Sequence, residues 1–190
     1  MARPRAYAIA DVLEAAMEEF WRRGFVATSM ADIYAATGLK PGNLYATFKD
    51  KDSLFRQAFE AYAVRFRATL PTDREGRAAI AAWLDIQAAL AIEDPERRGC
   101  LIINTIIERE AHSPETRALA ESRMAEIRAF FARHVALAAA SGELAAGTDE
   151  ARLTDALVGA VVAIMSLGRA GADAIMIRHV ADQARVMAGG

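Results

Sequence analysis

Residues 28–51 read TSMADIYAATGLKPGNLYATFKDK, and this stretch decides the fold. Thr28 and Ser29 carry side-chain oxygens that can accept hydrogen bonds from the first free amides of a helix. Gly38 can adopt the left-handed conformation that ends a short helix, and Pro41 suits the first turn of the next one. The stretch therefore predicts a helix-turn-helix, in which the second of two short helices enters the major groove of DNA.

The second of these helices carries a family resemblance. Residues 42–55, GNLYATFKDKDSLF, resemble the G-x-L-Y-x-x-F-x-x-K-x-x-L-[FL] signature of the tetracycline-repressor (TetR) family. Tyr34 and Lys40 depart from the family pattern, which usually has a small residue and a serine there. The resemblance implies a homodimeric transcriptional regulator, a repressor that a small-molecule inducer releases from its operator. Upstream positions that match the pattern as well are Gly24, Phe25, Thr28, Asp32, Ile33, Gly38 and Leu39.

Composition predicts an ordinary soluble, all-α protein. The chain has 190 residues, of which 54% are hydrophobic and 25% charged, and it contains only five prolines. We expect no membrane partner, because no apolar run reaches the length of about 18–20 residues that a span needs. We read no signal peptide at the start of the sequence. A single cysteine excludes an intramolecular disulfide and fits a reducing cytoplasm.

Side chains in and around the second short helix are the predicted DNA contacts. Asparagine can bond adenine bidentately, threonine and tyrosine can meet a thymine methyl group, and lysines can pair with phosphates. Leu44 and Phe48 instead fall on the inward side of the helix. The alternative is that some of the polar residues only cap or solubilise it. The predicted DNA-binding residues are Arg3, Arg5, Thr28, Ser29, Lys40, Pro41, Gly42, Asn43, Tyr45, Thr47, Lys49 and Lys51.

About nine helices and two units are predicted along the chain. Apolar residues recur at helical spacing in residues 6–23 and again after residue 51, and Pro71 breaks the fourth helix. We take residues 1–71 as the DNA-binding unit with its connecting helix, and residues 72–190 as a ligand-binding and dimerisation unit. The helices expected in the second unit span about 75–92, 101–111, 114–140, 151–167 (with Gly168 as its cap) and 174–187.

The last two helices are the predicted dimer interface. Both carry a broad apolar face, with small residues interleaved in the first of them, and such a face must be buried somewhere. A four-helix bundle formed by two copies about a two-fold axis is one solution, and a dimer is what a palindromic operator requires. The predicted interface residues are Leu153, Leu157, Val161, Ile164, Met176 and Val180.

Residues of the middle helices are candidates for an inducer pocket. They combine apolar side chains with a few polar groups, which is the usual composition of a small-molecule site, although each is also an ordinary core residue type. The candidates are Trp83, Gln87, Cys100, Asn104, Glu108, Met124, Phe130 and His134.

Cys100 supports an alternative, a redox or electrophile sensor. It stands in the segment RRGCLIIN, followed by Glu108, which resembles a stretch in a subset of TetR-family regulators, some of which sense oxidants through a cysteine there. Arg97 and Arg98 would favour a thiolate, whereas burial among Leu101 and its apolar neighbours would make the cysteine inert.

No catalytic constellation, metal-ligand spacing or phosphate-binding loop is evident in the sequence. We therefore predict no enzyme, no metal and no cofactor. A DNA-binding protein that responds to no ligand is the remaining alternative.

Overall fold

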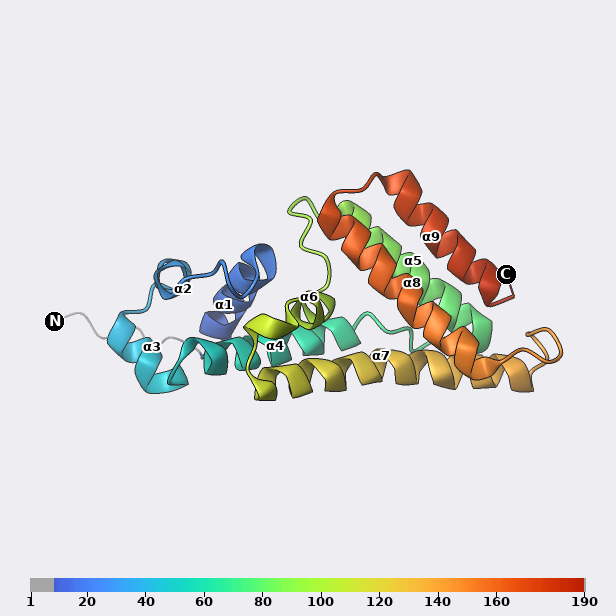
Figure 1. Cartoon of the computed structure of the whole chain (residues 1–190), viewed down its shortest axis with the longest axis horizontal. Helices are drawn as coiled ribbons and strands as arrows, with labels where there is room; N and C mark the ends of the chain where they lie inside the picture. Colours follow the sequence, from blue (N-terminus) through green and yellow to red (C-terminus); the bar gives the residue numbers. More distant parts are fainter. Residues whose placement is uncertain (1–8, 190) are drawn as a thin grey trace.

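The computed structural model describes residues 9–189, and within this range the fold is entirely helical, as predicted (Figure 1). The helices end near the residues that the caps and breakers indicate. Arg3 and Arg5 lie outside the described residues. The elements are α1 (Ile9–Arg23), α2 (Met30–Thr37), α3 (Pro41–Phe48), α4 (Lys51–Arg67), α5 (Gly76–Glu93), α6 (Leu101–Ile107), η1 (Arg109–Ala111), α7 (Pro114–Ala140), α8 (Glu150–Ala170) and α9 (Ala174–Met187).

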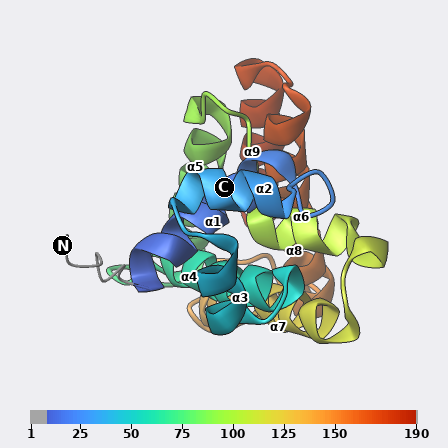
Figure 2. The same ribbon diagram turned by 90° about the vertical axis from the view of Figure 1, so that its left-hand side faces the viewer.

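The first three helices form a compact head at one end of the molecule (Figures 1 and 2). Ser29 caps α2 in a capping box, in which its hydroxyl accepts from the Asp32 amide while the Asp32 carboxylate accepts from the Ser29 amide. Gly38 ends α2 with a φ of 67°, and Pro41 begins α3. Leu44 and Phe48 are buried, so α3 is held by one face and leaves the opposite face outward, as predicted.

Helix α4 joins the head to the rest of the protein. It packs on α1 at one end and runs beside the long helix α7, while α5, α8 and α9 form a bundle at the end opposite the head (Figure 1). Helix α6 lies between these parts and packs against α7. The bundle and the head are therefore connected by α4, α6 and α7 rather than by one flexible linker.

Helix α8 differs from the prediction in its end and in its hydropathy. It continues to Ala170, and Gly171, with a φ of 76°, ends it in place of Gly168. By length and mean hydropathy of 1.5 it could cross a membrane, contrary to our reading of the sequence. The same hydropathy suits a core helix, and α8 packs against α5, α7 and α9.

Gly168 lies inside α8 because that helix touches α5 there. A Cβ at this position would lie 2.9 Å from both the Cβ and the carbonyl oxygen of Ala91. The prediction that Gly168 caps the helix is therefore wrong. Its role is to permit the close approach of two helices.

Gly168→Ala is expected to destabilise the protein by about 1–3 kcal/mol, because the new methyl group forces α8 away from α5. The Tm should fall by several degrees in a thermal melt followed by circular dichroism. Gly42→Ala is the control, since a Cβ there would meet no heavy atom within 4 Å. Equal melting of the Gly168→Ala variant and wild type would contradict the packing described here.

Candidate DNA-binding face, dimer groove and ligand cavity

The outward face of α3 carries most of the predicted DNA contacts. Asn43, Thr47 and Lys49 are exposed, and Tyr45 is 48% exposed. Lys40 is the N-cap residue of α3, and its side chain makes no capping hydrogen bond with the helix. The face combines hydrogen-bonding side chains with cations at both ends of one short helix, which is the composition that major-groove binding requires. Pro41 and Gly42 are exposed beside them.

Three of the predicted contacts have different surroundings. Thr28 is fully buried, and its hydroxyl donates to the Gly24 carbonyl oxygen at 2.7 Å, so its side chain has no surface to offer to DNA. The Lys51 ammonium donates to the Phe25 carbonyl oxygen at 2.6 Å and lies over the Phe25 ring. Ser29 is exposed, but its hydroxyl serves the capping box. These side chains build the head that presents α3.

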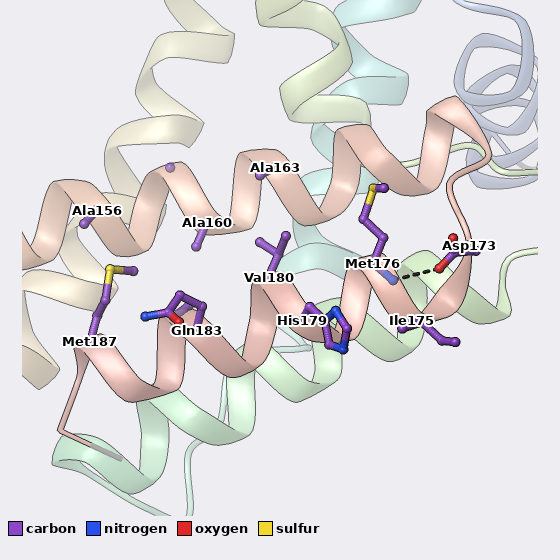
Figure 3. Close-up of a pocket in the computed structure, with 12 residues that line it drawn as sticks. Ala156, Ala160, Ala163, Asp173, Ile175, Met176, His179, Val180, Gln183 and Met187 are labelled. Atoms are coloured by element: carbon purple, nitrogen blue, oxygen red, sulfur yellow. Dashed lines mark hydrogen bonds between the residues drawn. The ribbon is translucent and has the colours of Figure 1, made fainter.

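A groove of about 740 Å³ runs between α8 and α9 (Figure 3). Its α8 wall consists of small residues, Ala156, Gly159, Ala160 and Ala163. Its α9 wall carries larger side chains that are mostly apolar, together with His179 and Gln183. In Figure 3 the alanines of α8 lie opposite Val180, Gln183 and Met187 of α9. The groove lies at the end of the molecule away from the head.

Four of the six predicted dimer residues do not face this groove. Leu157, Val161 and Ile164 are at most 1% exposed, and Leu153 is 7% exposed, within a single copy of the chain. Their apolar stripe is the core of the protomer, because α8 also packs against α5 and α7. The prediction for these four residues is corrected. Met176 and Val180 do line the groove, together with the small residues of α8.

A cavity of about 400 Å³ lies where the head meets the rest of the protein. Its walls come from α1, α4 and the segment that follows it, α5, α8 and the loop before α6. Of the eight predicted pocket residues only Gln87 lines it. The remaining lining residues could not be predicted from the sequence, because they belong to helices of two different predicted units. The periodicity within one helix does not reveal where two units meet. The lining residues are Trp21, Tyr62, Arg65, Phe66, Thr69, Gln87, Leu90, Glu93, Asp94, Pro95, Arg98, Gly99 and Met165.

The other predicted pocket residues lie elsewhere. Trp83, Phe130 and His134 form an aromatic cluster between α5 and α7, with the Trp83 and Phe130 ring centroids 4.8 Å apart. Met124 is half-buried beside the core. Asn104 donates to the Arg98 carbonyl oxygen at 2.8 Å and so fixes the loop before α6. These five residues make packing and loop contacts and do not line the 400 Å³ cavity.

Glu108 contacts the head directly. Its carboxylate accepts from the Phe25 backbone amide at 3.2 Å. A Cβ on Gly24 would lie 2.7 Å from the same carboxylate, so the glycine, with a φ of 84°, allows this approach. Glu108 therefore joins the end of α6 to the α1–α2 turn, and the prediction that it lines a pocket is corrected.

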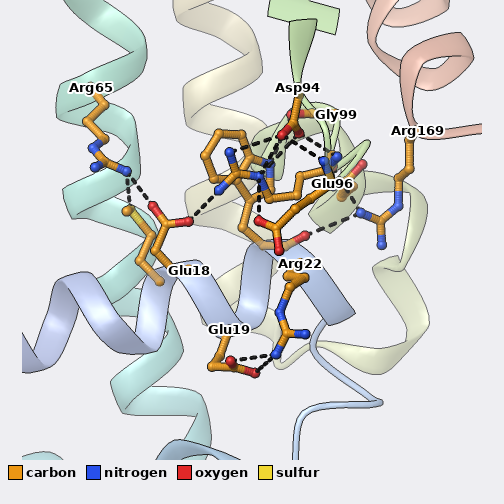
Figure 4. A network of polar contacts seen from close by, with 12 residues as sticks. Glu18, Glu19, Arg22, Arg65, Asp94, Glu96, Gly99 and Arg169 are labelled. Atoms are coloured by element: carbon orange, nitrogen blue, oxygen red, sulfur yellow. Dashed lines mark hydrogen bonds and ion pairs between the residues drawn. The ribbon is translucent and has the colours of Figure 1, made fainter. Parts of the chain in front are cut away.

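A second junction is a network of polar contacts that includes Glu18 of α1, Arg65, Gly99 and Arg169 (Figure 4). The Trp21 indole donates to the Gly99 carbonyl oxygen at 2.9 Å, and the Arg98 guanidinium lies 4.1 Å from its ring centroid. Arg169 of α8 donates to the Trp21 and Arg98 carbonyl oxygens. Glu18 pairs with both Arg98 and Arg65. Helix α1 is thus tied to the α5–α6 loop and to α8 by specific polar contacts.

Family models match both parts of the chain. A model of bacterial regulatory proteins of the tetR family matches residues 12–58, and one of the tetracyclin repressor-like C-terminal domain matches residues 76–184. The chain belongs to the TetR family. The family consists of transcription regulators rather than enzymes, as predicted.

Curated TetR-family relatives include two with substantial identity. The HTH-type transcriptional repressor ComR of Escherichia coli (strain K12) is 36% identical over 107 residues, which cover 54% of this chain and 51% of ComR. The match thus spans about half the length of ComR. The uncharacterized HTH-type transcriptional regulator YezE of Bacillus subtilis (strain 168) is 31% identical over 148 residues, 76% of each chain.

Solved structures of TetR-family regulators share the fold over nearly the whole chain. A cysteine mutant of CifR, complexed with 26-bp double-strand operator DNA, matches with a TM-score of 0.82 at 26% identity, covering 97% of this chain and 98% of CifR. A regulator from Chloroflexus aurantiacus matches with a TM-score of 0.82 at 28% identity, covering 92% and 90% of the two chains.

Cys100 of this TetR-family chain is 1% exposed at the start of α6. Burial raises the pKa of its thiol, against the opposing effect of a hydrogen bond with Tyr62. A buried thiol with a raised pKa is a poor nucleophile at neutral pH. The geometry therefore favours the packing role over the sensor role. Among residues 9–189, no three His, Cys, Asp or Glu side chains are grouped to hold a metal ion.

His112 lies at the same junction as Glu108. Its ring is held between those of Phe25 and Phe55, with centroid distances of 4.7 and 4.9 Å, and neither ring nitrogen finds a hydrogen-bond partner within the described range. Burial lowers the pKa of His112 below its ordinary value of 6.5, against the opposing charges of Glu108 and Asp52 and with a smaller contribution from Lys51.

Stability is expected to fall in acid because of His112. Because the pKa of His112 is lower in the folded protein, its ring is neutral in both the folded and the unfolded chain above the ordinary pKa. As the pH falls below that value, the unfolded chain takes up the proton first, and the free energy of unfolding decreases. Denaturant unfolding at about pH 7 and about pH 5 should show a larger loss in wild type than in His112→Phe. His134, whose pKa is also lowered by burial, remains in both proteins and is a constant background. An equal loss in both proteins would contradict this prediction.

Proposed function

We propose that the protein is a homodimeric, cytoplasmic repressor that binds a palindromic operator and leaves it when a small molecule binds. Residues 1–71 are the DNA-binding unit with α4 as its connector, and residues 72–190 hold the ligand and the dimer interface. The observation that carries the proposal is the exposed polar face of α3, presented by a buried Leu44 and Phe48. CifR, with the same fold, is known bound to operator DNA.

The partner at the α8–α9 groove is a second copy of the chain. Small residues on α8 let the helix of another copy approach closely, and exposed Met176 and half-buried Val180 supply apolar surface for it. Two α8–α9 pairs about a two-fold axis form a four-helix bundle, and the resulting dimer carries two DNA-binding heads. Two heads separated by about 34–36 Å, or a multiple of this helical turn, would read two half-sites.

Release by an inducer follows from the way the head is held. The head touches the rest of the protein at the Trp21 and Glu108 junctions as well as through α4, so a ligand that changes these contacts changes the placement of α3. A coupling of about 1–3 kcal/mol is typical and lowers operator affinity by roughly 5–150-fold. The ligand must bind the released state more tightly, because equal affinity for both states shifts nothing.

Two alternatives remain from the sequence. A redox sensor acting through Cys100 would need a reactive thiol, and its burial argues against one. A regulator that binds no ligand would need no cavity. The cavity of about 400 Å³ at the junction argues against this alternative and in favour of a ligand. Small-molecule release is therefore the function that the geometry favours.

The test is fluorescence anisotropy on operator DNA selected from random sequence. The purified protein should bind the selected site with a steep salt dependence and should prefer it to random DNA by at least about 10³-fold. A mild thiol oxidant should leave binding unchanged, whereas oxidant-triggered release would support the Cys100 sensor instead. Weak binding without sequence preference would refute the proposed function.

A further inference from the structure

The cavity at the head–body junction contains one buried acceptor that lacks a partner. Gln87 is fully buried, and its side-chain oxygen Oε1 makes no hydrogen bond within the described residues. A buried amide oxygen without a partner costs free energy, which a hydrogen-bond donor on a ligand would recover. Because Gln87 lines the cavity, its side-chain amide lies in the wall against which a ligand would pack.

The orientation of the Gln87 amide follows from its neighbours. The Thr69 hydroxyl donates to the Phe66 carbonyl oxygen at 2.7 Å, so its hydrogen is already committed. The same hydroxyl oxygen accepts from the Trp83 indole at 3.1 Å and from Gln87 Nε2 at 3.4 Å. Gln87 must therefore present its NH₂ group to Thr69 and keep Oε1 as the unused acceptor.

The walls of the cavity select a neutral, planar molecule. Trp21, Tyr62 and Phe66 provide aromatic surface, and Leu90, which is 48% exposed, adds an apolar group to the lining. The two cations in the lining are already neutralised. Arg98 pairs with Asp94 and Glu18, and Arg65 pairs with Glu14 and Glu18. Glu93 is exposed to solvent.

We propose that this cavity binds a small, uncharged aromatic molecule that carries an N–H or O–H group, and that this group donates to Gln87 Oε1. The volume of about 400 Å³ suits one or two fused rings with short substituents. The proposal rests on the proposed function in one respect, namely that this site is where the inducer of the regulator acts.

A ligand in this cavity touches the contacts that hold α1. Trp21 forms part of the wall, and its indole is bonded to the Gly99 carbonyl oxygen, which belongs to another lining residue. Arg98, which covers the Trp21 ring, also lines the cavity. Occupation of the site therefore acts on the Trp21 junction, and through it on the head, in addition to any movement of α4.

Indole and benzofuran are the probes that test the donor. They have nearly the same shape, but only indole carries an N–H group. Isothermal titration calorimetry on the full-length protein should show that indole binds at least about tenfold more tightly, because benzofuran leaves the Gln87 acceptor unpaired. Equal affinities, or no binding of either probe, would overturn the proposal without any variant.

Two variants test whether Gln87 causes the preference for indole over benzofuran. Gln87→Leu should bind both probes with equal affinity, whereas Gln57→Leu, which changes an exposed glutamine of α4, should keep the wild-type preference for indole. Thermal melts establish that both variants are folded. A preference that survives Gln87→Leu would assign the donor to another acceptor and overturn the proposal.

The two tryptophans report where the probe binds. The chain has two indole N–H groups, those of Trp21 and Trp83, and Trp83→Phe assigns their NMR signals. Indole should shift the Trp21 signal strongly. An unshifted Trp21 signal in protein that has bound indole would place the probe elsewhere and refute this site. Operator binding by the probe-free protein is measured separately. If the protein does not bind an operator but still binds indole more tightly than benzofuran in a way that depends on Gln87, the proposed function is refuted and the ligand site is supported.

Discussion

Replacing Ala163 with glutamate is expected to turn the protein into a monomer and to abolish specific operator binding. Ala163 lines the α8 wall of the groove, where a second copy would cover it. A carboxylate there would be buried without a partner in both copies, which costs several kcal/mol. Loss of the dimer leaves each head to bind alone, and the affinity gained from linking two half-sites, about 10²–10⁴-fold, disappears.

Light scattering after size exclusion measures the mass directly. Wild type should give twice the 20.5 kDa of one chain, and Ala163→Glu should give that of one. Ala151→Glu is the matched control, since it makes the same change on the same helix at an exposed position outside the groove. A dimeric Ala163→Glu protein that still bound the operator would refute the α8–α9 interface.

The head could be predicted from sequence because its signals are local. Ser29, Gly38 and Pro41 act on their own turns of backbone, so the limits of α2 and α3 follow from the residues that form them. The same holds for α7 and α9, whose first residues follow Ser113 and Asp173, both of which accept from an amide of the first turn. Capping chemistry does not depend on the rest of the fold.

The interface and the cavity could not be predicted in the same way. Helix α8 is apolar on two sides, and periodicity cannot say which side faces the protomer core. The apolar pattern predicts the larger residues, such as Leu157 and Ile164, at the dimer interface. They are instead buried inside one copy, while the small residues line the groove. The cavity depends on Trp21 and Gln87 meeting across two units, which only the packing of α1 against the body decides.

Asn43→Ala and Lys49→Ala are expected to weaken operator binding in different ways. Asn43 lies in the first turn of α3, from which recognition helices contact base edges, and a lost bidentate contact with a base costs about 1–3 kcal/mol in each half-site. Lys49 follows the end of α3 and is suited to a phosphate, so its loss should weaken binding to all sequences alike. Alanine is a better helix former than asparagine, so weaker binding by Asn43→Ala cannot be attributed to unfolding of α3.

Salt and sequence dependence separate the two roles. In anisotropy titrations, Asn43→Ala should lose about 5–150-fold per half-site on the operator and little on random DNA, with an unchanged salt slope. Lys49→Ala should lose affinity on both DNAs, and its slope of log affinity against log salt should fall by about two in the dimer, one for each lost phosphate contact. A changed slope with Asn43→Ala, or a changed sequence preference with Lys49→Ala, would show that the roles are reversed. Such a result would mean that α3 lies in the major groove in a different rotation about its own axis. It would still be the recognition helix, because Leu44 and Phe48 fix only which face of α3 is buried.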